Sequence, residues 1–363
     1  MRILVDRIEV AVYTVPTDAP EADGTLEWDS TTIVVVHAHG GGASGLGYTY
    51  ADPSTAMLIE TKLASVVQER DARAPRSSWA AMVRATRNLG RPGITSMAIS
   101  AVDVALWDLH ARLLDTPLAQ LLGMARDHVP VYGSGGFTSY TNDRLQGQLA
   151  GWVSQGIPRV KMKVGTEPGR DPERVRAARE AIGPDTELFV DANGAYSRKQ
   201  ALALAGTFAQ QASVSWFEEP VSSDDLRGLR LLRDRVPAGI AIAAGEYGYD
   251  AVYFKRMLEA EAVDVLQADI TRCGGVTELL RIDGMCRAHS LPLSLHCGPA
   301  IHAHAGTALA QLRHVEYFHD HVRIEEMLFD GLPDLRDGAL WPDLDRPGLG
   351  LELKRDDAAA YAV

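Results

Sequence analysis

The chain has 363 residues, 46% of them hydrophobic, which supports a sizeable core and exceeds one average domain. No stretch approaches the roughly 20 consecutive apolar residues of a membrane span. The net charge of −12 argues against nucleic acid or an anionic membrane as a partner. Three cysteines, Cys273, Cys286 and Cys297, form no metal-spacing motif and point to a reducing, cytoplasmic setting.

The first 50 residues predict an antiparallel sheet built from the apolar segments 7–15, 31–40 and 41–50. Charged residues inside the apolar N-terminal stretch 1–15, Asp6, Arg7 and Glu9, indicate a strand rather than a secretory signal. Residues 16–30 are polar, contain five acids and no Lys or Arg, and are expected to form a loop. Helices follow, notably over 96–123, where Gly123 supplies a C-terminal stop.

From residue 129 to about 317 apolar strand-like runs alternate with helical segments, as parallel βα units require. The run "VPVYGSGG" (129–136) is the expected first strand, and the charged helix 170–182 follows the second. The length fits an α/β protein with a (β/α)8 barrel of about 250 residues and a smaller partner domain. The tail 318–363 is expected to fold back on that small domain.

Seven polar residues lie at or near the ends of successive apolar runs, 20 to 28 residues apart. They are Lys163, Asp191, Glu218, Glu246, Asp269, His296 and Glu316. A strand, a loop and a returning helix need roughly 20 to 30 residues, so each residue can end a different strand. The C-terminal strand ends of a barrel converge on one mouth, which predicts a metal-assisted proton-transfer site.

Three of these residues, Asp191, Glu218 and Glu246, offer hard oxygen ligands of the kind Mg²⁺ prefers. A single acid at a strand end is more often a helix N-cap or part of a surface ion pair. Three in register favour a metal, because unshared like charges would repel. Asn193 offers an amide to the substrate or serves as a turn residue beside Gly194.

Lys161 and Lys163 are two residues apart and therefore share one face of a strand. Two lysines inside a barrel indicate function, whereas lysines on an edge strand would face solvent. A nearby cation and a second lysine would lower the pKa of Lys163 and make it a general base.

Asp269 and His296 end neighbouring strands, where a carboxylate would hold one imidazole nitrogen and leave the other basic. A lone histidine is more often a packing residue, and this chain has eleven. Glu316 is expected to bind a substrate oxygen or to pair with an arginine. Glu219 should face away from Glu218 and pair with a lysine.

The motifs "VKMKVG", "DANG", "WFEEP", "AAGE", "QAD", "SLH" and "VEYF" in this order resemble the enolase superfamily, most closely its mandelate racemase subgroup. The segment "SAVDVALWDLHARLLDTPLAQLLG" resembles the linker helix of that family. The resemblance implies a modified (β/α)7β barrel with an α+β capping domain formed by the N-terminal region and the C-terminal tail. It sets expected boundaries at 1–125 for the capping domain and linker helices, 126–320 for the barrel, and 321–363 for the tail.

The resemblance also implies Mg²⁺-dependent abstraction of the proton α to a carboxylate, giving an enediolate. Asp191, Glu218 and Glu246 would hold the metal, with Lys163 and the His296–Asp269 dyad as acid/base groups on opposite substrate faces. Lys161 and Glu316 would polarise the substrate carboxylate, which Ser134 would also contact. The family implies a homo-oligomer with an even number of subunits.

Dehydration of an acid sugar, an aldonate or aldarate, to a 2-keto-3-deoxy acid is the favoured reaction. Racemisation or epimerisation of an α-hydroxy acid or amino-acid derivative is the alternative. Cycloisomerisation ranks lower because those relatives resemble a pattern with lysine where this chain has Asp269. A non-catalytic barrel ranks last.

Specificity is expected from residues 16–30 and 45–56 of the capping domain, with Tyr48 and Tyr50 lining the pocket. The acidic first segment would disfavour a dicarboxylate and suit a polyol tail or a cation, unless it is merely solvated. In the histidine-rich segment 316–326, His319 and His321 either reach the site or hold the tail against the barrel.

Overall fold

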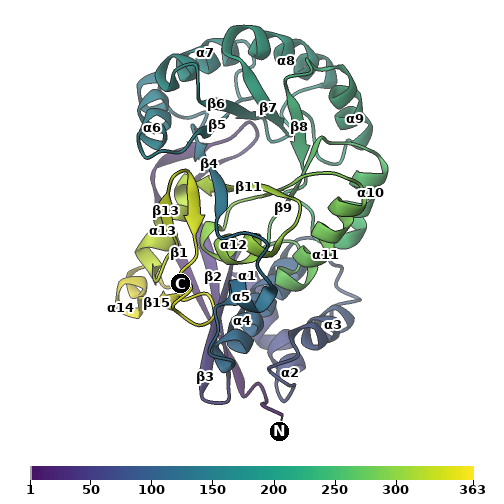
Figure 1. The fold of residues 1–363 in the computed structure, drawn as a ribbon, viewed down its shortest axis with the longest axis vertical. Helices are drawn as coiled ribbons and strands as arrows, with labels where there is room; N and C mark the ends of the chain where they lie inside the picture. The colour runs from purple at the N-terminus through teal and green to yellow at the C-terminus, as the bar shows by residue number, and fades with distance from the viewer. Residues whose placement is uncertain (1) are drawn as a thin grey trace.

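A closed barrel of eight parallel strands forms the centre of the computed structural model, which describes residues 2–363 (Figure 1). The barrel strands pair in chain order, and the last strand pairs with the first through Val315 and Val131. They are β4 (Val129–Gly135), β5 (Arg159–Lys163), β6 (Glu187–Asp191), β7 (Val214–Glu218), β8 (Ala241–Ala244), β9 (Val265–Ala268), β10 (Leu293–Leu295) and β11 (Leu312–Phe318). The predicted barrel is confirmed.

Helices cover the outside of the barrel (Figure 1). They are α6 (Asn142–Ser154), α7 (Asp171–Ile182), α8 (Arg198–Ala212), α9 (Leu226–Arg235), α10 (Ala251–Glu259), α11 (Gly275–Ala288) and α12 (Pro299–Ala305). The helix expected over 170–182 is α7. The apolar sides of the strands and helices form one large core, in which strand residues such as Val160, Val190 and Phe217 are fully buried.

The capping domain is a three-stranded antiparallel sheet, β1 (Arg7–Ala22), β2 (Glu27–Gly40) and β3 (Ala43–Tyr50), with helices on one side. The helical segments are α1 (Ser54–Leu58), the π-helix η1 (Ile59–Leu63), α2 (Ala64–Val67), α3 (Pro75–Ala85), α4 (Ile94–Leu113) and α5 (Leu118–Leu122). The single helix expected over 96–123 is broken before Pro117, which disfavours helical backbone at the residue before it. Gly123 ends α5 with a positive φ of 85°, as expected.

The loop expected over residues 16–30 is wrong in its extent, because β1 runs to Ala22 and β2 starts at Glu27. The strand pairing is irregular after Pro16 and resumes where Glu21 faces Trp28. The Trp28 indole donates to the Glu21 carboxylate at 2.9 Å, and Asp23 accepts from the amide of Leu26 at 2.8 Å to close the turn. The acidic residues therefore belong to a long hairpin, in which Glu21 and Asp23 are buried and the other three acids are exposed.

The segment after the barrel contacts both other parts of the protein. It comprises α13 (His319–Leu328), β12 (Phe329–Asp330), β13 (Asp334–Arg336), β14 (Ala339–Trp341), β15 (Glu352–Leu353), α14 (Arg355–Ala358) and the 3₁₀ turn η3 (Ala359–Tyr361). Strand β14 pairs antiparallel with the start of β4, and Val363 donates its amide to Val12 of the capping sheet at 3.1 Å. The tail thus reaches the small domain, as expected, and also extends the barrel sheet at β4. The exact domain boundaries stay a prediction.

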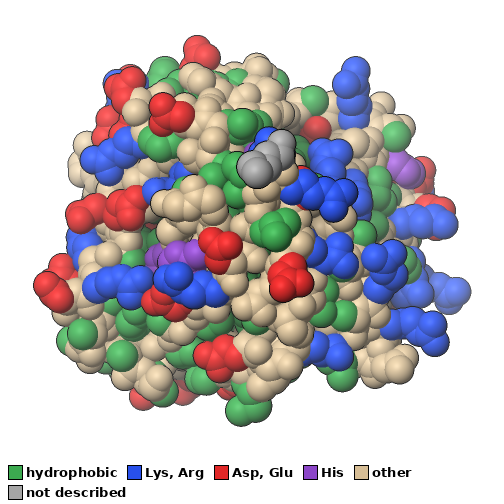
Figure 2. Space-filling model, turned by 90° about the horizontal axis from the view of Figure 1, so that it is seen from below, with side chains coloured by type: hydrophobic (Ala, Val, Ile, Leu, Met, Phe, Trp, Pro, Cys, Tyr) green, Lys and Arg blue, Asp and Glu red, His purple; other side chains and the backbone are tan. Residues whose placement is uncertain are grey.

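Surface charge is not uniformly acidic despite the net charge of −12. Figure 2 shows the end of the molecule that carries the capping sheet, where basic side chains gather on one side and acidic and basic ones are interspersed on the other. None of the described helices is long and apolar enough to cross a membrane.

The glycine-rich segment of β3 allows the sheet to lie against α4. A Cβ atom on Gly45 would lie 2.2 Å from the Leu109 amide nitrogen, and one on Gly47 would lie 2.3 Å from the Ala101 carbonyl oxygen. Both clashes involve backbone, which cannot move away as a flexible side chain does. The glycines therefore set the distance between the sheet and its central helix.

We expect Gly47→Ala to lower the free energy of unfolding by about 1–3 kcal/mol, the usual cost of overpacking a core. Gly147→Ala is the matched control, because Gly147 lies in α6 with open space around its Cβ position. That change should be neutral or slightly stabilising. Urea unfolding of both variants tests this, and equal stabilities would contradict the close approach.

Candidate active site

The seven residues predicted from their spacing converge at the C-terminal mouth of the barrel. Lys163, Asp191 and Glu218 are the last residues of β5, β6 and β7. Glu246 follows β8, Asp269 follows β9, His296 follows β10, and Glu316 lies within β11. All seven are buried. The barrel therefore concentrates four carboxylates, one lysine and the Asp–His pair beneath the capping hairpin.

The three proposed metal ligands form a compact cluster. One carboxylate oxygen from each of Asp191, Glu218 and Glu246 lies within 4.8 Å of the others. Burial raises the pKa of Glu218, and the nearby Asp191 raises it further. The Oε2 atom of Glu246 is buried without a hydrogen-bond partner among the described residues. Clustered oxygens, mutual repulsion and an unsatisfied acceptor fit a hard divalent cation.

Lys161 is fully buried and joins three of the acids. Its Nζ atom lies 2.6 Å from Glu218, 2.7 Å from Glu316 and 3.4 Å from Asp191. Burial would lower the pKa of Lys161, but Glu218 and Glu316 outweigh burial and raise it. Lys161 is therefore a permanent positive charge at the base of the site.

The charge on Lys163 is set by its carboxylate neighbour. Burial acts to lower the pKa, but Asp191 at 2.5 Å outweighs it, so the pKa is raised. The Lys163 ammonium also donates to the Asn193 side-chain oxygen at 3.1 Å. The expected lowering of its pKa by a cation and a second lysine stays a prediction.

Asp269 and His296 form the predicted dyad. The His296 Nδ1 atom lies 2.8 Å from Asp269 Oδ2, while Thr271 donates to the other carboxylate oxygen at 2.7 Å. Burial would raise the pKa of Asp269, but the bond to His296 outweighs it and lowers the pKa. An ionised Asp269 holds the Nδ1 proton and leaves Nε2 toward Glu246, 3.2 Å away.

Glu316 accepts from two partners at its Oε1 atom, Lys161 at 2.7 Å and the Ser134 hydroxyl at 2.5 Å. Burial would raise the pKa of Glu316, but Lys161 outweighs burial and lowers it. Glu316 is therefore ionised. It pairs with a lysine in place of the arginine that was one of its two expected partners. Ser134 is fully buried, and its hydroxyl is directed to Glu316 rather than into the pocket.

Glu219 does not pair with a lysine in the way expected. Its Oε1 atom is buried without a hydrogen-bond partner among the residues described here, and its backbone has a φ of +36°. Burial raises its pKa, and Glu246 and Asp191 raise it further. The positive φ ends the strand geometry after Glu218, so the alternation rule for side-chain direction no longer applies to Glu219.

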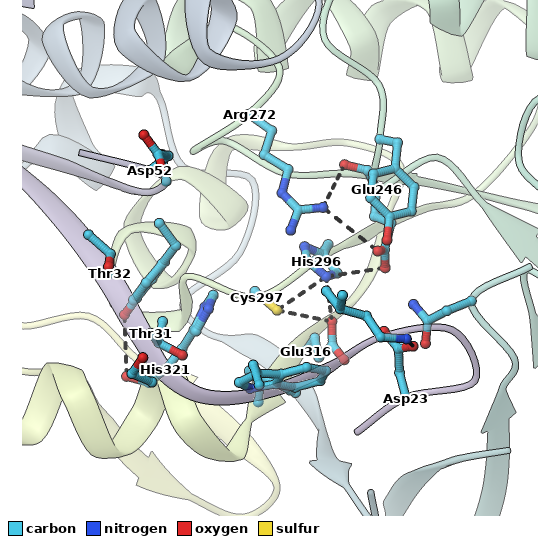
Figure 3. A pocket seen from close by; sticks show the side chains of 18 of the residues that line it. Asp23, Thr31, Thr32, Asp52, Glu246, Arg272, His296, Cys297, Glu316 and His321 are labelled. Atoms are coloured by element: carbon cyan, nitrogen blue, oxygen red, sulfur yellow. Dashed lines mark hydrogen bonds and ion pairs between the residues drawn. The ribbon is translucent and has the colours of Figure 1, made fainter. Parts of the chain in front are cut away.

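A pocket of about 380 Å³ opens above these residues (Figure 3). Lys163, Asn193, Glu246, His296 and Glu316 line its barrel side. The capping domain contributes a second wall, including Asp23, Trp28, Thr31, Thr32, Tyr50 and Asp52. Both segments expected to shape specificity, 16–30 and 45–56, thus reach the pocket.

The two tyrosines expected in the pocket differ in position. Tyr50 lines it and stacks on His321 with ring centroids 3.4 Å apart. Tyr48 lies behind it, fully buried, with its hydroxyl donating to Glu325 at 2.5 Å. Tyr48 and Tyr50 are two residues apart and so share one side of the strand. Strand twist and the neighbouring tail then decide which of the two side chains reaches the cavity.

The two histidines left open in the 316–326 segment also separate. His321 lines the pocket, whereas His319 contacts Asp18 of the hairpin at 3.3 Å.

Sequence reasoning missed Arg272, Cys297, Thr31 and Thr32 as lining residues. Cys297 and Arg272 were detectable in principle, because they directly follow His296 and the Asp269 turn. The two threonines gave no signal, because they begin the predicted strand 31–40 and lie outside the two segments expected to shape specificity.

Comparison with known families decides the relationship. Residues 7–123 match the mandelate racemase/muconate lactonizing enzyme N-terminal domain, and residues 144–358 match the enolase C-terminal domain-like family. The chain belongs to the mandelate racemase/muconate lactonizing enzyme family. The predicted membership of the enolase superfamily is thereby confirmed.

Curated members of the family include both dehydratases and cycloisomerases. The chain is 29% identical to arabinonate dehydratase of Saccharolobus solfataricus, covering 92% of this chain and 90% of that protein. It is 31% identical to L-talarate/galactarate dehydratase of Salmonella typhimurium, covering 86% and 78%. It is 30% identical to 3,6-anhydro-alpha-L-galactonate cycloisomerase of Streptomyces coelicolor, covering 99% and 100%. These similar identities do not separate the two reactions.

Solved structures of the family superpose closely on this one. A mandelate racemase/muconate lactonizing enzyme-like protein from Rubrobacter xylanophilus has a TM-score of 0.97 at 62% identity, covering 99% of both chains. The Salmonella typhimurium L-talarate/galactarate dehydratase bound to Mg and L-lyxarohydroxamate has a TM-score of 0.91 at 27% identity, covering 100% of this chain and 94% of that one.

We expect Asp191→Asn to weaken Mg²⁺ binding by more than about tenfold, because one charged ligand is lost. Glu187→Gln is the control: Glu187 begins the same strand, at the opposite end of the barrel, where it pairs with Arg159. Isothermal titration with Mg²⁺ measures both variants. Equal affinities would place the cation elsewhere.

Proposed function

We propose that this protein is a Mg²⁺-dependent enzyme that abstracts the proton α to a carboxylate and dehydrates an acid sugar to a 2-keto-3-deoxy acid. The observation that carries the proposal is the His296 imidazole, held by Asp269 at 2.8 Å, with its free nitrogen facing the carboxylate cluster. A lysine lies at the same cluster, so two acid/base groups share one pocket. The dehydratase relatives support the reaction class.

Asp191, Glu218 and Glu246 would hold Mg²⁺, which neutralises the negative charge that develops on the substrate carboxylate. Lys161 adds a fixed positive charge at the base of the site, where Glu316 keeps it in place at 2.7 Å. Such preorganised charge supplies the largest share of the rate, since a carbon acid α to a carboxylate is very weak.

Proton transfer would use the two basic groups from separate strands. Lys163 on β5 removes the α-proton, or His296 after β10 does so for the opposite configuration. In dehydration the second group protonates the leaving β-hydroxyl, so that water departs. If the substrate has no leaving group, the same pair returns a proton to the α-carbon and the reaction is racemisation or epimerisation. Racemisation or epimerisation is therefore the alternative function, because it needs the same two groups, Lys163 and His296.

We expect Lys163→Ala and His296→Ala each to lower turnover about 10²–10⁴-fold, the usual contribution of general acid–base catalysis. Lys199→Ala and His289→Ala are matched controls, because both residues are exposed on the surface. Proton NMR in D₂O with Mg²⁺ and a library of sugar acids, α-hydroxy acids and amino-acid derivatives measures turnover. Full activity of Lys163→Ala on the true substrate would disprove the mechanism.

The NMR experiment also distinguishes the candidate reactions. Loss of water to a 2-keto-3-deoxy product establishes a dehydratase and identifies its substrate. Deuterium at the α-position without elimination establishes a racemase or epimerase. Tight Mg²⁺ binding with no exchange on any carboxylate would support a non-catalytic barrel.

We further propose that the substrate is a monocarboxylic aldonate rather than a dicarboxylic aldarate. Among the lining residues the capping domain contributes acids and hydroxyls, notably Asp23, Thr31 and Asp52. The Arg272 guanidinium, which also lines the pocket, lies 3.5 Å from Asp269 and 3.7 Å from Glu246. A second substrate carboxylate would therefore meet acids instead of a free cation.

We expect a higher kcat/KM for an aldonate than for the aldarate with the same stereochemistry, a difference that Asp52→Lys should reduce. Asp52 is ionised, since hydrogen bonds from Ser54 lower its pKa. Asp185→Lys makes the same charge change on an exposed site and should leave the ratio as it is. A wild-type preference for the aldarate would contradict this assignment.

A further inference from the structure

A second set of possible metal ligands lies beside the carboxylate cluster. One atom from each of His296, Cys297 and Glu316 lies within 4.8 Å of the others, and all three side chains are buried. This set contains a nitrogen, a sulfur and an oxygen, whereas the cluster of Asp191, Glu218 and Glu246 contains only oxygens. Figure 3 shows the imidazole, the thiol and the carboxylate facing one another at the floor of the pocket.

The spacing of these three atoms matches a tetrahedral metal centre. Cys297 Sγ lies 3.2 Å from His296 Nε2 and 3.5 Å from Glu316 Oε2, and the latter two atoms are 3.6 Å apart. Zinc bonds of about 2.0–2.3 Å at tetrahedral angles place ligand atoms about 3.3–3.8 Å apart, so two of the distances fall in this range and the 3.2 Å distance is slightly shorter. Three ligands at this spacing leave one position for water or substrate, and all three residues line the pocket.

Each ligand is held from behind by a different partner. His296 is fixed through Nδ1 by Asp269, the support typical of a metal-bound imidazole. Glu316 is held at Oε1 by Lys161, which leaves Oε2 for a metal. Cys297 has a left-handed backbone with φ +51°, and its carbonyl accepts from His302 at 2.7 Å. The thiol is thus directed at the imidazole by backbone geometry.

We propose that His296, Cys297 and Glu316 form a site for Zn²⁺ or another thiophilic divalent cation, separate from the Mg²⁺ site. Thiolate and imidazole favour zinc, while Mg²⁺ prefers oxygen ligands in an octahedron. Binding displaces the thiol proton to solvent and forms the metal–sulfur bond without any change of oxidation state. Glu246 Oε2, 3.2 Å from His296 Nε2, adds negative charge beside the cation.

The consequence for activity rests on the proposed function. A cation on His296 Nε2 occupies the lone pair that would accept or deliver a proton, so zinc would inhibit the enzyme while Mg²⁺ stays bound. The metal site itself does not depend on the reaction, because its three ligands are set by the fold.

The first test is direct binding of the metal in excess Mg²⁺. We expect wild-type protein to bind one Zn²⁺ at this site, and Co²⁺ to give the near-ultraviolet thiolate charge-transfer band of a cobalt–sulfur bond. Cys297→Ala should weaken zinc binding by more than about tenfold and abolish the band. Cys286→Ala is the matched control, since Cys286 is buried in α11 and is not among the lining residues.

The cobalt band separates this site from other places that could bind zinc. The three-carboxylate cluster and the group Asp18, Glu21 and His319 contain no sulfur, so neither can give that band. A band that survives in Cys297→Ala, or its absence from wild type, would overturn the proposal. If Cys297→Ala does not fold, Cys297→Ser serves as the second variant.

Inhibition is measured separately on whichever substrate the NMR screen identifies. We expect Cys297→Ala to need more than about tenfold more Zn²⁺ for half-inhibition than wild type, relative to its own uninhibited rate. A cobalt–sulfur band without any turnover would confirm the metal site and reject the proposed function. Turnover that zinc inhibits equally in wild type and Cys297→Ala would reject the metal site and retain the function.

Discussion

The buried ammonium of Lys161 is the interaction on which the rest of the mouth depends. It lies within 3.4 Å of carboxylate oxygens from three separate strands, β6, β7 and β11. Unpaired charges in a protein interior cost several kcal/mol each, so the ammonium between these acids favours their close approach. Strands that are far apart in the chain are thereby held at one point. The ring of Tyr132, 5.2 Å below, closes the ammonium off from the barrel interior.

The same charges require a cover. A polar cluster open to water would lose most of its electrostatic effect, because screening by water weakens each interaction. The capping hairpin supplies the cover, and its turn is tied to the barrel through the Asp23 carbonyl, which accepts from Thr138 and Thr166 at 2.8 Å. On the far side of the pocket the Thr31 hydroxyl donates to Asp320 in α13. The cover therefore belongs to the fold on both sides of the mouth.

The barrel and the seven mouth residues could be predicted from sequence because both follow a strict period. Each βα unit has similar length, and the polar residue at its end interrupts a strongly apolar run. The extent of the hairpin could not be predicted, because acids at 18, 21, 23, 27 and 29 hide the strand pattern. The contact between Lys163 and Asp191 could not be predicted for a related reason: spacing along a strand shows which residues share a face, and not which of several charges is nearest.

The failures at Tyr48, Ser134 and Glu219 have a common origin as well. Each depends on the direction of one side chain, which is decided by contacts with a segment distant in sequence or by a single backbone torsion. Glu325 holds Tyr48, Glu316 holds Ser134, and a positive φ turns Glu219. Periodicity contains no information on such contacts. Cys297 also has a positive φ, and it lines the pocket one residue after His296, which was predicted to lie at the mouth.

The pairing of the tail with β1 and β4 affects the order in which the strands can pair while the chain is synthesised. A ribosome delivers β1 first, yet Tyr13 forms its bridge with Ala362, and the edge of β4 is covered by β14 only after the whole barrel has emerged. Local hairpins and βα units can form early, whereas these contacts span almost the entire chain and close late. Until then the first strand and the first barrel strand present open edges, and open strand edges favour pairing with other chains.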